Sequence, residues 1–284
     1  MDTLFSDPTP SPHSLSPQQF LALTGRSDSP LVIDVRREAR FAESERILCS
    51  AKRCAPEAVA KFAQDHVPQD AVLYCAHGHE VSAQAAATLR AAGWNARFLQ
   101  GGIEGFVESG LPTLRKRADL GVTGEKASRW ITRERPKIDR IACPWLIRRF
   151  IDPRAEFFYV PTAQVFEEAA RLGAMAYDIP GAPISHEAVH CSFDTLLAAF
   201  ELRARPLDQL ARIVRGADTD RLDLAAQSAG LLALSLGLSR LHQDDHAMLQ
   251  AALPLYDALY AWCQGAQLET HSWNPKTLTQ GGAA

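Results

Sequence analysis

The sequence predicts an α/β protein in two parts, a parallel sheet flanked by helices and then a mostly helical α+β region. In the first part, short apolar runs typical of strands alternate with helical segments, as in βαβ units. In the second part, apolar residues recur at three- and four-residue steps over long segments. With 284 residues, 46% of them hydrophobic, the chain is long enough for two domains with buried cores.

The first domain is predicted over residues 15–115. Ser16 and Pro17 are typical of a helix N-cap and of the first helical position. Three runs have the continuous apolar character of strands covered on both faces: "PLVIDVR", "AVLY" and "NARFLQGG". The "SAQAAATLRAAG" segment predicts a helix between the last two strands, with Gly93 as its C-cap.

The second domain is predicted over residues 130–272, after a linker at 116–129. The linker segment is charged, contains two glycines and shows no apolar period. Short strands are expected at "FFYVP" and "AMAYDIP". Apolar periodicity predicts helices near residues 192–202, 207–217, 229–241 and 246–263.

Charge and composition exclude several classes of protein. The net charge of −3 gives no sign of a nucleic-acid or membrane-surface partner. No apolar run is long enough to span a bilayer, and the first twenty residues lack the basic and apolar regions of a signal peptide, so we expect a cytoplasmic protein. The six cysteines form no CxxC pair, which argues against a zinc ribbon or a disulfide framework.

The stretch "YCAHGHEVS" places Cys75 where a predicted strand ends and a helix is about to begin. Backbone N–H groups at such a junction converge on one point at the positive end of the helix dipole. They favour the thiolate form of a cysteine and can hold a sulfonate, persulfide or phosphate. Gly78 permits the tight turn, while His77 and His79 supply further donors. The alternative is a buried structural cysteine at a strand end.

The first domain resembles a single rhodanese domain over roughly residues 15 to 115. The resemblance rests on the "DVR" strand end, the "CxxGxxxS" loop and the "L-x-GG-I-x-x-F" ending. It implies that Cys75 accepts a sulfane sulfur as a persulfide and passes it to a thiophilic acceptor, without a cofactor. Asp34 and Arg36 would brace the site. The loop that would cradle the persulfide consists of Ala76, His77, Gly78, His79, Glu80 and Val81.

Two departures from the rhodanese pattern bear on the substrate. The chain has "ERILCSA" where the family often has a "GHIPGA" turn, and Glu80 stands in a loop that often carries an arginine. A negative charge beside an anion-binding loop should weaken the binding of a dianionic donor, so thiosulfate is expected to be a poor substrate. No arginine occurs between Cys75 and Arg90, which argues against the related phosphatase chemistry.

The second domain opens with a strongly basic segment, which predicts either a solvated helix face with ion pairs or a pocket for an oxyanion. Its cations are Arg133, Arg135, Lys137, Arg140, Arg148 and Arg149. Further on, the spacing of His186, His190 and Cys191 suits a metal site, although such a cluster is more often structural. His242 and His246 repeat the spacing among surface-type acids.

This half also resembles the C-terminal ChrB-type domain of chromate-resistance proteins, through "TRERPKIDRIACPWLIRRFIDP", "FYVP", "DIPG" and "IVRGADTDRLDLA". The resemblance implies a link to chromate stress and, in some members, regulation of an exporter operon. Those regulators carry a different N-terminal half, which weakens a DNA-binding interpretation. The candidates for a shared site are Asp139, Cys143, His186, Cys191 and Asp218; on a helix, Asp139 and Cys143 would share a face.

Together these patterns predict a sulfurtransferase linked to chromate resistance, with a small-molecule sulfur donor, a thiol acceptor and chromate as a further ligand. One alternative is a non-catalytic sensor of chromate or of redox state that regulates a partner. A second is a rhodanese domain that serves only as a docking module. A Cys75 without unusual reactivity would support the docking interpretation.

Overall fold

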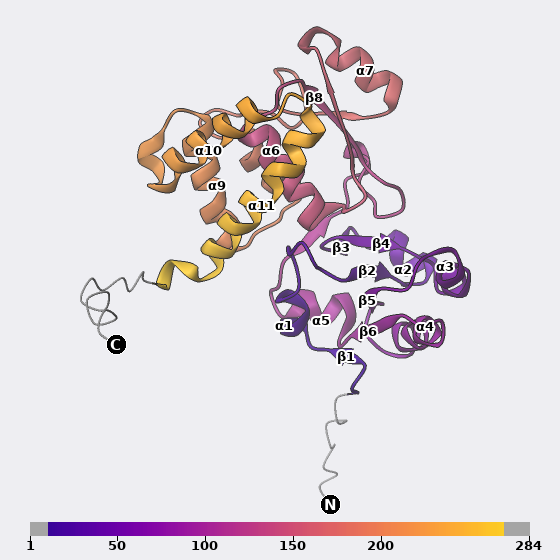
Figure 1. Cartoon of the computed structure of the whole chain (residues 1–284). Coiled ribbons are helices and arrows are strands. Elements are labelled where there is room, and N and C mark those ends of the chain that lie inside the picture. The colour runs from indigo at the N-terminus through magenta and orange to yellow at the C-terminus, as the bar shows by residue number, and fades with distance from the viewer. Residues whose placement is uncertain (1–10, 270–284) are drawn as a thin grey trace, which may run out of the picture.

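A computed structural model of the chain describes residues 11–269, which form two halves that pack against each other (Figure 1). Part of the segment on which the signal-peptide expectation rests, residues 1–10, lies outside this range. Among the described residues, no helix combines the length and the apolar character needed to cross a lipid bilayer.

The N-terminal half is built on a parallel five-stranded sheet, which confirms the predicted fold class. Its strands, in spatial order, are β1 (Ser14–Leu15), β6 (Asn95–Leu99), β5 (Asp70–Tyr74), β2 (Leu31–Asp34) and β4 (Ala51–Arg53). Its helices are α1 (Pro17–Leu21), α2 (Glu38–Glu43), α3 (Val59–Asp65), α4 (Glu80–Ala91) and α5 (Gly102–Glu108). Ser16 caps α1 with Pro17 at its first position, as the sequence predicts.

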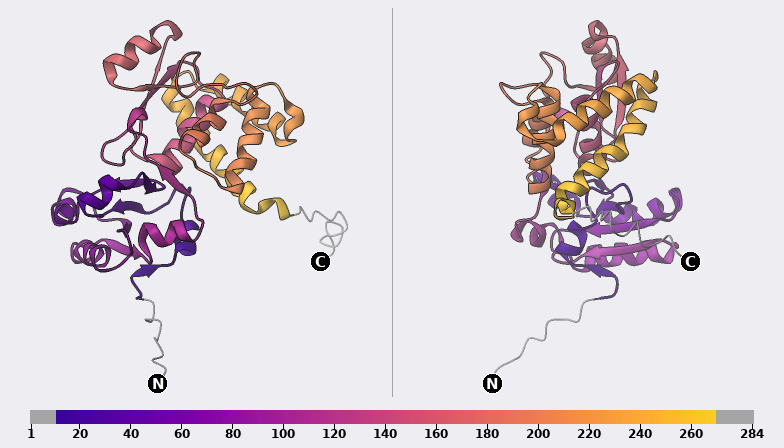
Figure 2. Two further views of the ribbon diagram at one scale, coloured as in Figure 1. Left: turned by 180° about the vertical axis from the view of Figure 1, so that it is seen from behind. Right: turned by 60° about the vertical axis from the view of Figure 1, so that its left-hand side comes forward.

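Helices cover both faces of this sheet (Figures 1 and 2). Successive residues of a strand point to opposite faces, so Leu73 and Cys75 share a core with α3 and α4, while Val72 and Tyr74 face α1 and α5. The core that contains Val72 and Tyr74 continues without a break into the C-terminal half, where it includes Trp145. The face of the sheet opposite Cys75 is therefore buried against the rest of the protein.

Backbone hydrogen bonds join the two halves near a second, antiparallel sheet. This sheet belongs to the N-terminal half and pairs β3 (Arg46–Leu48) with β7 (Thr113–Arg115). Next to it, the Ser50 amide donates to the Phe150 carbonyl at 2.7 Å, and the Arg115 amide donates to the Phe200 carbonyl at 3.1 Å. The predicted linker that follows is an ordered connection, because it contributes Leu120 and Val122 to the core.

The C-terminal half contains a three-stranded parallel sheet, in the order β10 (Met175–Ala176), β8 (Arg129–Arg133) and β9 (Glu156–Val160). Helix α7 (Val165–Leu172) packs on one face of it, and the other face meets the helical body. That body comprises α6 (Asp139–Leu146) with a π-helical turn at Ile147–Ile151, α8 (Ser192–Ala199), α9 (Arg205–Asp218), α10 (Gln227–Leu241) and α11 (Asp245–Gln264). Short 3₁₀ turns occupy Pro56–Ala58, Ala118–Leu120, Thr162–Gln164, Leu222–Leu224 and Ala266–Leu268.

Candidate functional site

Cys75 lies directly after β5, and α4 begins five residues later at Glu80. The thiol is almost fully buried, and its Sγ lies 3.3 Å from the Oγ of Ser82 in the first turn of α4. The backbone N–H groups from Ala76 to Ser82 donate to no acceptor among the described residues. The strand–loop–helix junction therefore surrounds Cys75 with free amide donors, in the geometry typical of an anion-binding nest.

The loop is held in place by the Gly101–Gly102 turn that follows β6. The Ile103 amide donates to the Cys75 carbonyl and the Glu104 amide to the Ala76 carbonyl, each at 3.0 Å. A side chain on Gly102 would place its Cβ 2.4 Å from both of these carbonyl oxygens. The two loops can approach this closely only because the turn carries no side chain there.

A cavity of about 320 Å³ opens beside Cys75. The loop contributes Ala76, His77, His79, Glu80 and Val81 to its lining, and the segment after β2 contributes Arg36, Arg37 and Arg40. Sequence reasoning placed Glu80 here without a compensating cation. Arg36 pairs with Asp34 and Arg40 with Glu43, which leaves Arg37 as the compensating cation. Arg37 lies near the loop because it follows β2, and the carboxyl ends of parallel strands meet at one edge of the sheet.

Asp34 at the end of β2 and Arg36 two residues later form a buried ion pair. The Arg36 guanidinium donates to both oxygens of Asp34, at 2.6 to 3.1 Å, and also to the Arg46 carbonyl. The Tyr74 hydroxyl donates to Asp34 Oδ2 at 2.7 Å, and burial raises the pKa of Tyr74 well above its usual value. The buried Nη1 of Arg36 has no partner among the described residues, although Arg36 lines the cavity beside Cys75.

A second cluster of polar side chains lies in the C-terminal half. It brings together Asp139 at the start of α6, Asp178 and His186 from the segment between β10 and α8, and Asp218 at the end of α9. The Nε2 of His186 lies 3.2 Å from Asp139, 3.4 Å from Asp178 and 3.0 Å from Asp218. Three of the five predicted residues therefore meet, and Asp178 joins them without having been predicted.

Burial and mutual repulsion dominate the electrostatics of this cluster. Burial first, and the Asp139 carboxylate second, raise the pKa of Asp178 to about 6 and that of Asp218 to about 8. The hydrogen bond to Asp139 raises the pKa of His186 to about 9, against the effect of burial. The negative charge of three carboxylates in one partly buried site must be compensated, either by protons or by a further cation.

The two predicted cysteines lie near this cluster without joining it. Cys143 is fully buried one helical turn after Asp139, and its burial raises the pKa of the thiol well above the usual value. Cys191 is the N-cap of α8, and its thiol donates to Asp194 at 3.5 Å. Burial also raises the pKa of Cys191, so both thiols are held in their protonated form.

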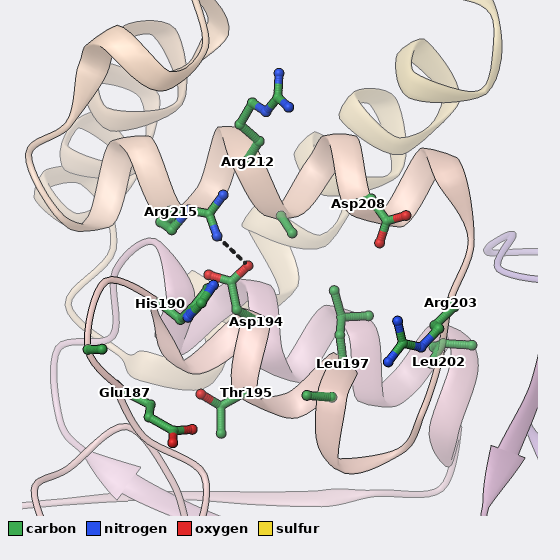
Figure 3. Close-up of a pocket in the computed structure, with 13 residues that line it drawn as sticks. Glu187, His190, Asp194, Thr195, Leu197, Leu202, Arg203, Asp208, Arg212 and Arg215 are labelled. Carbon is green, nitrogen blue, oxygen red and sulfur yellow. Dashed lines mark hydrogen bonds and ion pairs between the residues drawn. The ribbon is translucent and has the colours of Figure 1, made fainter.

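The structure does not bring the three metal-ligand candidates, His186, His190 and Cys191, together at one point. His190 is exposed and faces a groove of about 710 Å³ between α8 and α9 (Figure 3). In the same groove, Arg215 pairs with Asp194 at 3.2 Å. Among the described residues, the atoms close enough to hold one metal ion belong instead to Asp139, His186 and Asp218. His242 and His246 stand outside this group.

The basic segment forms no common oxyanion pocket, because only two of its arginines share a partner and the others point elsewhere. Arg140 and Arg133 approach Asp178, at 3.1 and 3.9 Å. Arg149 pairs with Asp257, and Arg148 lies over the Phe157 ring. The Arg135 side chain donates to carbonyls at the end of α10. The alternative prediction of separate ion pairs is the better description, although the segment begins as a strand.

Comparison with known families matches two separate parts of the chain. Residues 16–109 match the family described as rhodanese-like domain, and residues 130–263 match the family described as ChrB, C-terminal domain. A curated relative, Protein ChrB of Cupriavidus metallidurans, is 33% identical over 139 residues. That alignment covers 49% of this chain and 41% of the relative, so the chain spans about two fifths of the relative's length.

Solved structures similar to this chain cover about a third of it. A rhodanese-related protein from Thermoplasma volcanium is 20% identical and covers 36% of this chain and 96% of its own, with a TM-score of 0.31. A rhodanese homologue from Thermus thermophilus is 28% identical and covers 32% of this chain and 95% of its own, with a TM-score of 0.26.

Proposed function

Because the chain joins a rhodanese-like domain to a ChrB C-terminal domain, we propose that it is a sulfurtransferase in which Cys75 carries a persulfide. The observation that carries this proposal is the buried Cys75 thiol among free backbone amides at the start of α4. A nucleophile needs this setting because the amides stabilise both the attacking thiolate and the negatively charged persulfide that it becomes.

The transfer has two balanced steps. The Cys75 thiolate attacks the outer sulfur of a sulfane donor; the new S–S bond forms as the donor's S–S bond breaks, and the leaving group departs with the electron pair. With thiosulfate, the leaving group is sulfite. An acceptor thiolate then attacks the outer sulfur of the persulfide, which yields the acceptor persulfide and restores the Cys75 thiolate.

Charged groups around the cavity would govern the choice of donor. Arg37 attracts an anionic donor and Glu80 repels it, while the charge of Arg40 is shared with Glu43. Arg37 offsets the effect expected from Glu80 alone. We therefore infer that an anionic donor is accepted, with an affinity set by the balance of these charges.

Mass spectrometry of the intact protein tests the proposal. We expect the wild-type chain to gain the mass of one sulfur atom after incubation with thiosulfate or with a thiol persulfide. The gain should be reversed by cyanide and absent from Cys75→Ser, whereas Cys54→Ser, which alters another buried thiol of this half, should retain it. No sulfur gain from either donor in the wild type would refute the proposal.

Donor preference should follow the charges of the cavity. We expect Glu80→Gln to lower the thiosulfate concentration for half-maximal labelling by about 3- to 10-fold, and Arg37→Gln to raise it by a similar factor, because one charge near a dianion is worth on the order of 1 kcal/mol. Half-maximal concentrations from labelling curves at low and high salt provide the measurement. A neutral sulfane donor should show no such shift, and equal shifts for both donors would contradict the electrostatic explanation.

The ChrB C-terminal domain connects this chemistry with chromate in our proposal. Chromate is an oxidant that consumes thiols, so a persulfide carrier would act on the resulting damage or on chromate itself. The alternative is a regulatory sensor. Chromate binding that persists in Cys75→Ala, together with no turnover of any sulfur donor, would favour the sensor.

A further inference from the structure

The cluster around His186 has a geometry that hydrogen bonding alone does not explain. A neutral imidazole Nε2 carries either one hydrogen or one lone pair, yet carboxylate oxygens of Asp139, Asp178 and Asp218 lie 3.0 to 3.4 Å from this one nitrogen. A single N–H can satisfy one of them well. Ser192 also donates to the Asp139 and Asp178 oxygens that face His186, whereas Asp218 Oδ2 has no donor besides His186 among the described residues.

The same separations suit ligands of one metal ion. Ligand atoms bonded to a metal at about 2.0 to 2.2 Å lie roughly 3.0 to 3.5 Å apart in octahedral or tetrahedral geometry. The distances from His186 Nε2 to Asp139 and Asp218 fall in this range, at 3.2 and 3.0 Å. Ligand atoms of these three residues all lie within 4.8 Å of one another.

Charge at the cluster also favours a cation. Arg140 and Arg133 approach only Asp178, and among the described residues no lysine or arginine pairs with Asp139 or Asp218. Asp139 is almost completely buried, which makes an uncompensated carboxylate there costly. A divalent cation would compensate Asp139 and Asp218 together.

Neighbouring groups hold the carboxylates in place, as outer residues do in metal sites. The Ser192 amide donates to Asp139 at 3.1 Å, and the Ser192 hydroxyl donates to Asp178 at 2.8 Å. Arg140 holds the other oxygen of Asp178. Two separate helices, α6 and α9, thus aim the oxygens of Asp139 and Asp218 at the His186 nitrogen, while the half-exposed side chain of His186 leaves one side open to solvent.

We propose that Asp139, His186 and Asp218 bind one divalent first-row metal ion, while Asp178 stays paired with Ser192 and Arg140 beside them. One imidazole with two carboxylates is a donor set that suits Mn²⁺, Fe²⁺ or Zn²⁺. The open side would allow water or a small oxyanion to complete the coordination. This site is separate from Cys75 and does not depend on sulfur transfer.

Mn²⁺ binding to the full chain, after removal of metals by a chelator, tests the proposal. Mn²⁺ is the preferred probe because the free thiols compete much less for it than for Zn²⁺. We expect one Mn²⁺ per chain by isothermal titration, and a loss of affinity of at least 100-fold in Asp218→Asn. Asp208→Asn, which alters an exposed carboxylate on the same helix, should bind as the wild type does.

A second variant covers the case in which Asp218→Asn does not fold. His186→Gln alters a half-exposed side chain, and folding can be checked by circular dichroism. Pulsed electron paramagnetic resonance of bound Mn²⁺ should show coupling to one imidazole nitrogen in the wild type and in Cys75→Ser, and none in His186→Gln. Absence of stoichiometric Mn²⁺ binding by the wild type, or unchanged binding and nitrogen coupling in His186→Gln, would overturn the proposal.

Discussion

Asp34→Asn is expected to destabilise the protein by about 3–5 kcal/mol, because it leaves the Arg36 guanidinium buried without its counter-charge. Both side chains are 1% exposed, so water cannot replace the lost carboxylate. The hydroxyl of Tyr74 would lose a charged acceptor as well, because it donates to Asp34 Oδ2, which also accepts from Arg36. Denaturant unfolding followed by circular dichroism measures the change in the free energy of unfolding.

Asp28→Asn is the matched control for this prediction. Asp28 also pairs with an arginine two residues away, Arg26, and its carboxylate accepts two hydrogen bonds at 2.8 Å. Both partners are more than half exposed, so solvent screens the pair and its loss should change the stability little. Equal losses for the two variants would show that burial is not what makes the Asp34–Arg36 pair important.

The central strands of the N-terminal sheet could be predicted from the sequence because each is a continuous apolar run. This holds for β2, β5 and β6, which lie next to one another in the sheet. The shorter strands β1, β3, β4 and β7 were not predicted, since two or three residues are too few to show a period. Their pairing depends on tertiary contacts, such as those that place β3 beside β7.

The basic segment shows where local sequence is insufficient. Trp130 and Ile131 form the buried centre of β8, but the surrounding arginines hide this short strand in the sequence. The carboxylates that pair with Arg140 and Arg149 lie at Asp178 and Asp257, far along the chain. Convergence on one pocket and dispersal to separate partners therefore have the same local pattern.

The Cys75 site and the His186 cluster differ in how far they could be predicted from the sequence. The Cys75 loop is local, so its residues follow from one strand–helix junction, and Arg37 could have been found from the adjacency of β2 and β5. The His186 cluster is assembled from distant segments. Asp178 was missed, although the sequence offered a signal: it is an acidic residue just before the Pro180–Gly181 turn. In the structure its φ is +49°, which is uncommon for a residue other than glycine.

Gly102→Ala is expected to displace the Cys75 loop and to abolish sulfur loading as well as much of the stability of this half. The new Cβ would meet the Cys75 and Ala76 carbonyls at 2.4 Å, and backbone atoms at this distance must move. A φ of +58° adds strain, since only glycine adopts it freely. We expect a loss of at least about 2–3 kcal/mol in the free energy of unfolding, together with loss of the sulfur gain measured by mass spectrometry.

Gly105→Ala provides the comparison within the same short helix. A Cβ at Gly105 would meet no atom within 4 Å, and alanine is favoured over glycine inside a helix by about 0.5–1 kcal/mol. This variant should therefore keep or slightly raise the stability and load sulfur as the wild type does. If Gly102→Ala also loaded sulfur normally, the close packing of the two loops would not be what holds Cys75 among its amide donors. The free amides from Ala76 to Ser82 would then no longer support the persulfide proposal.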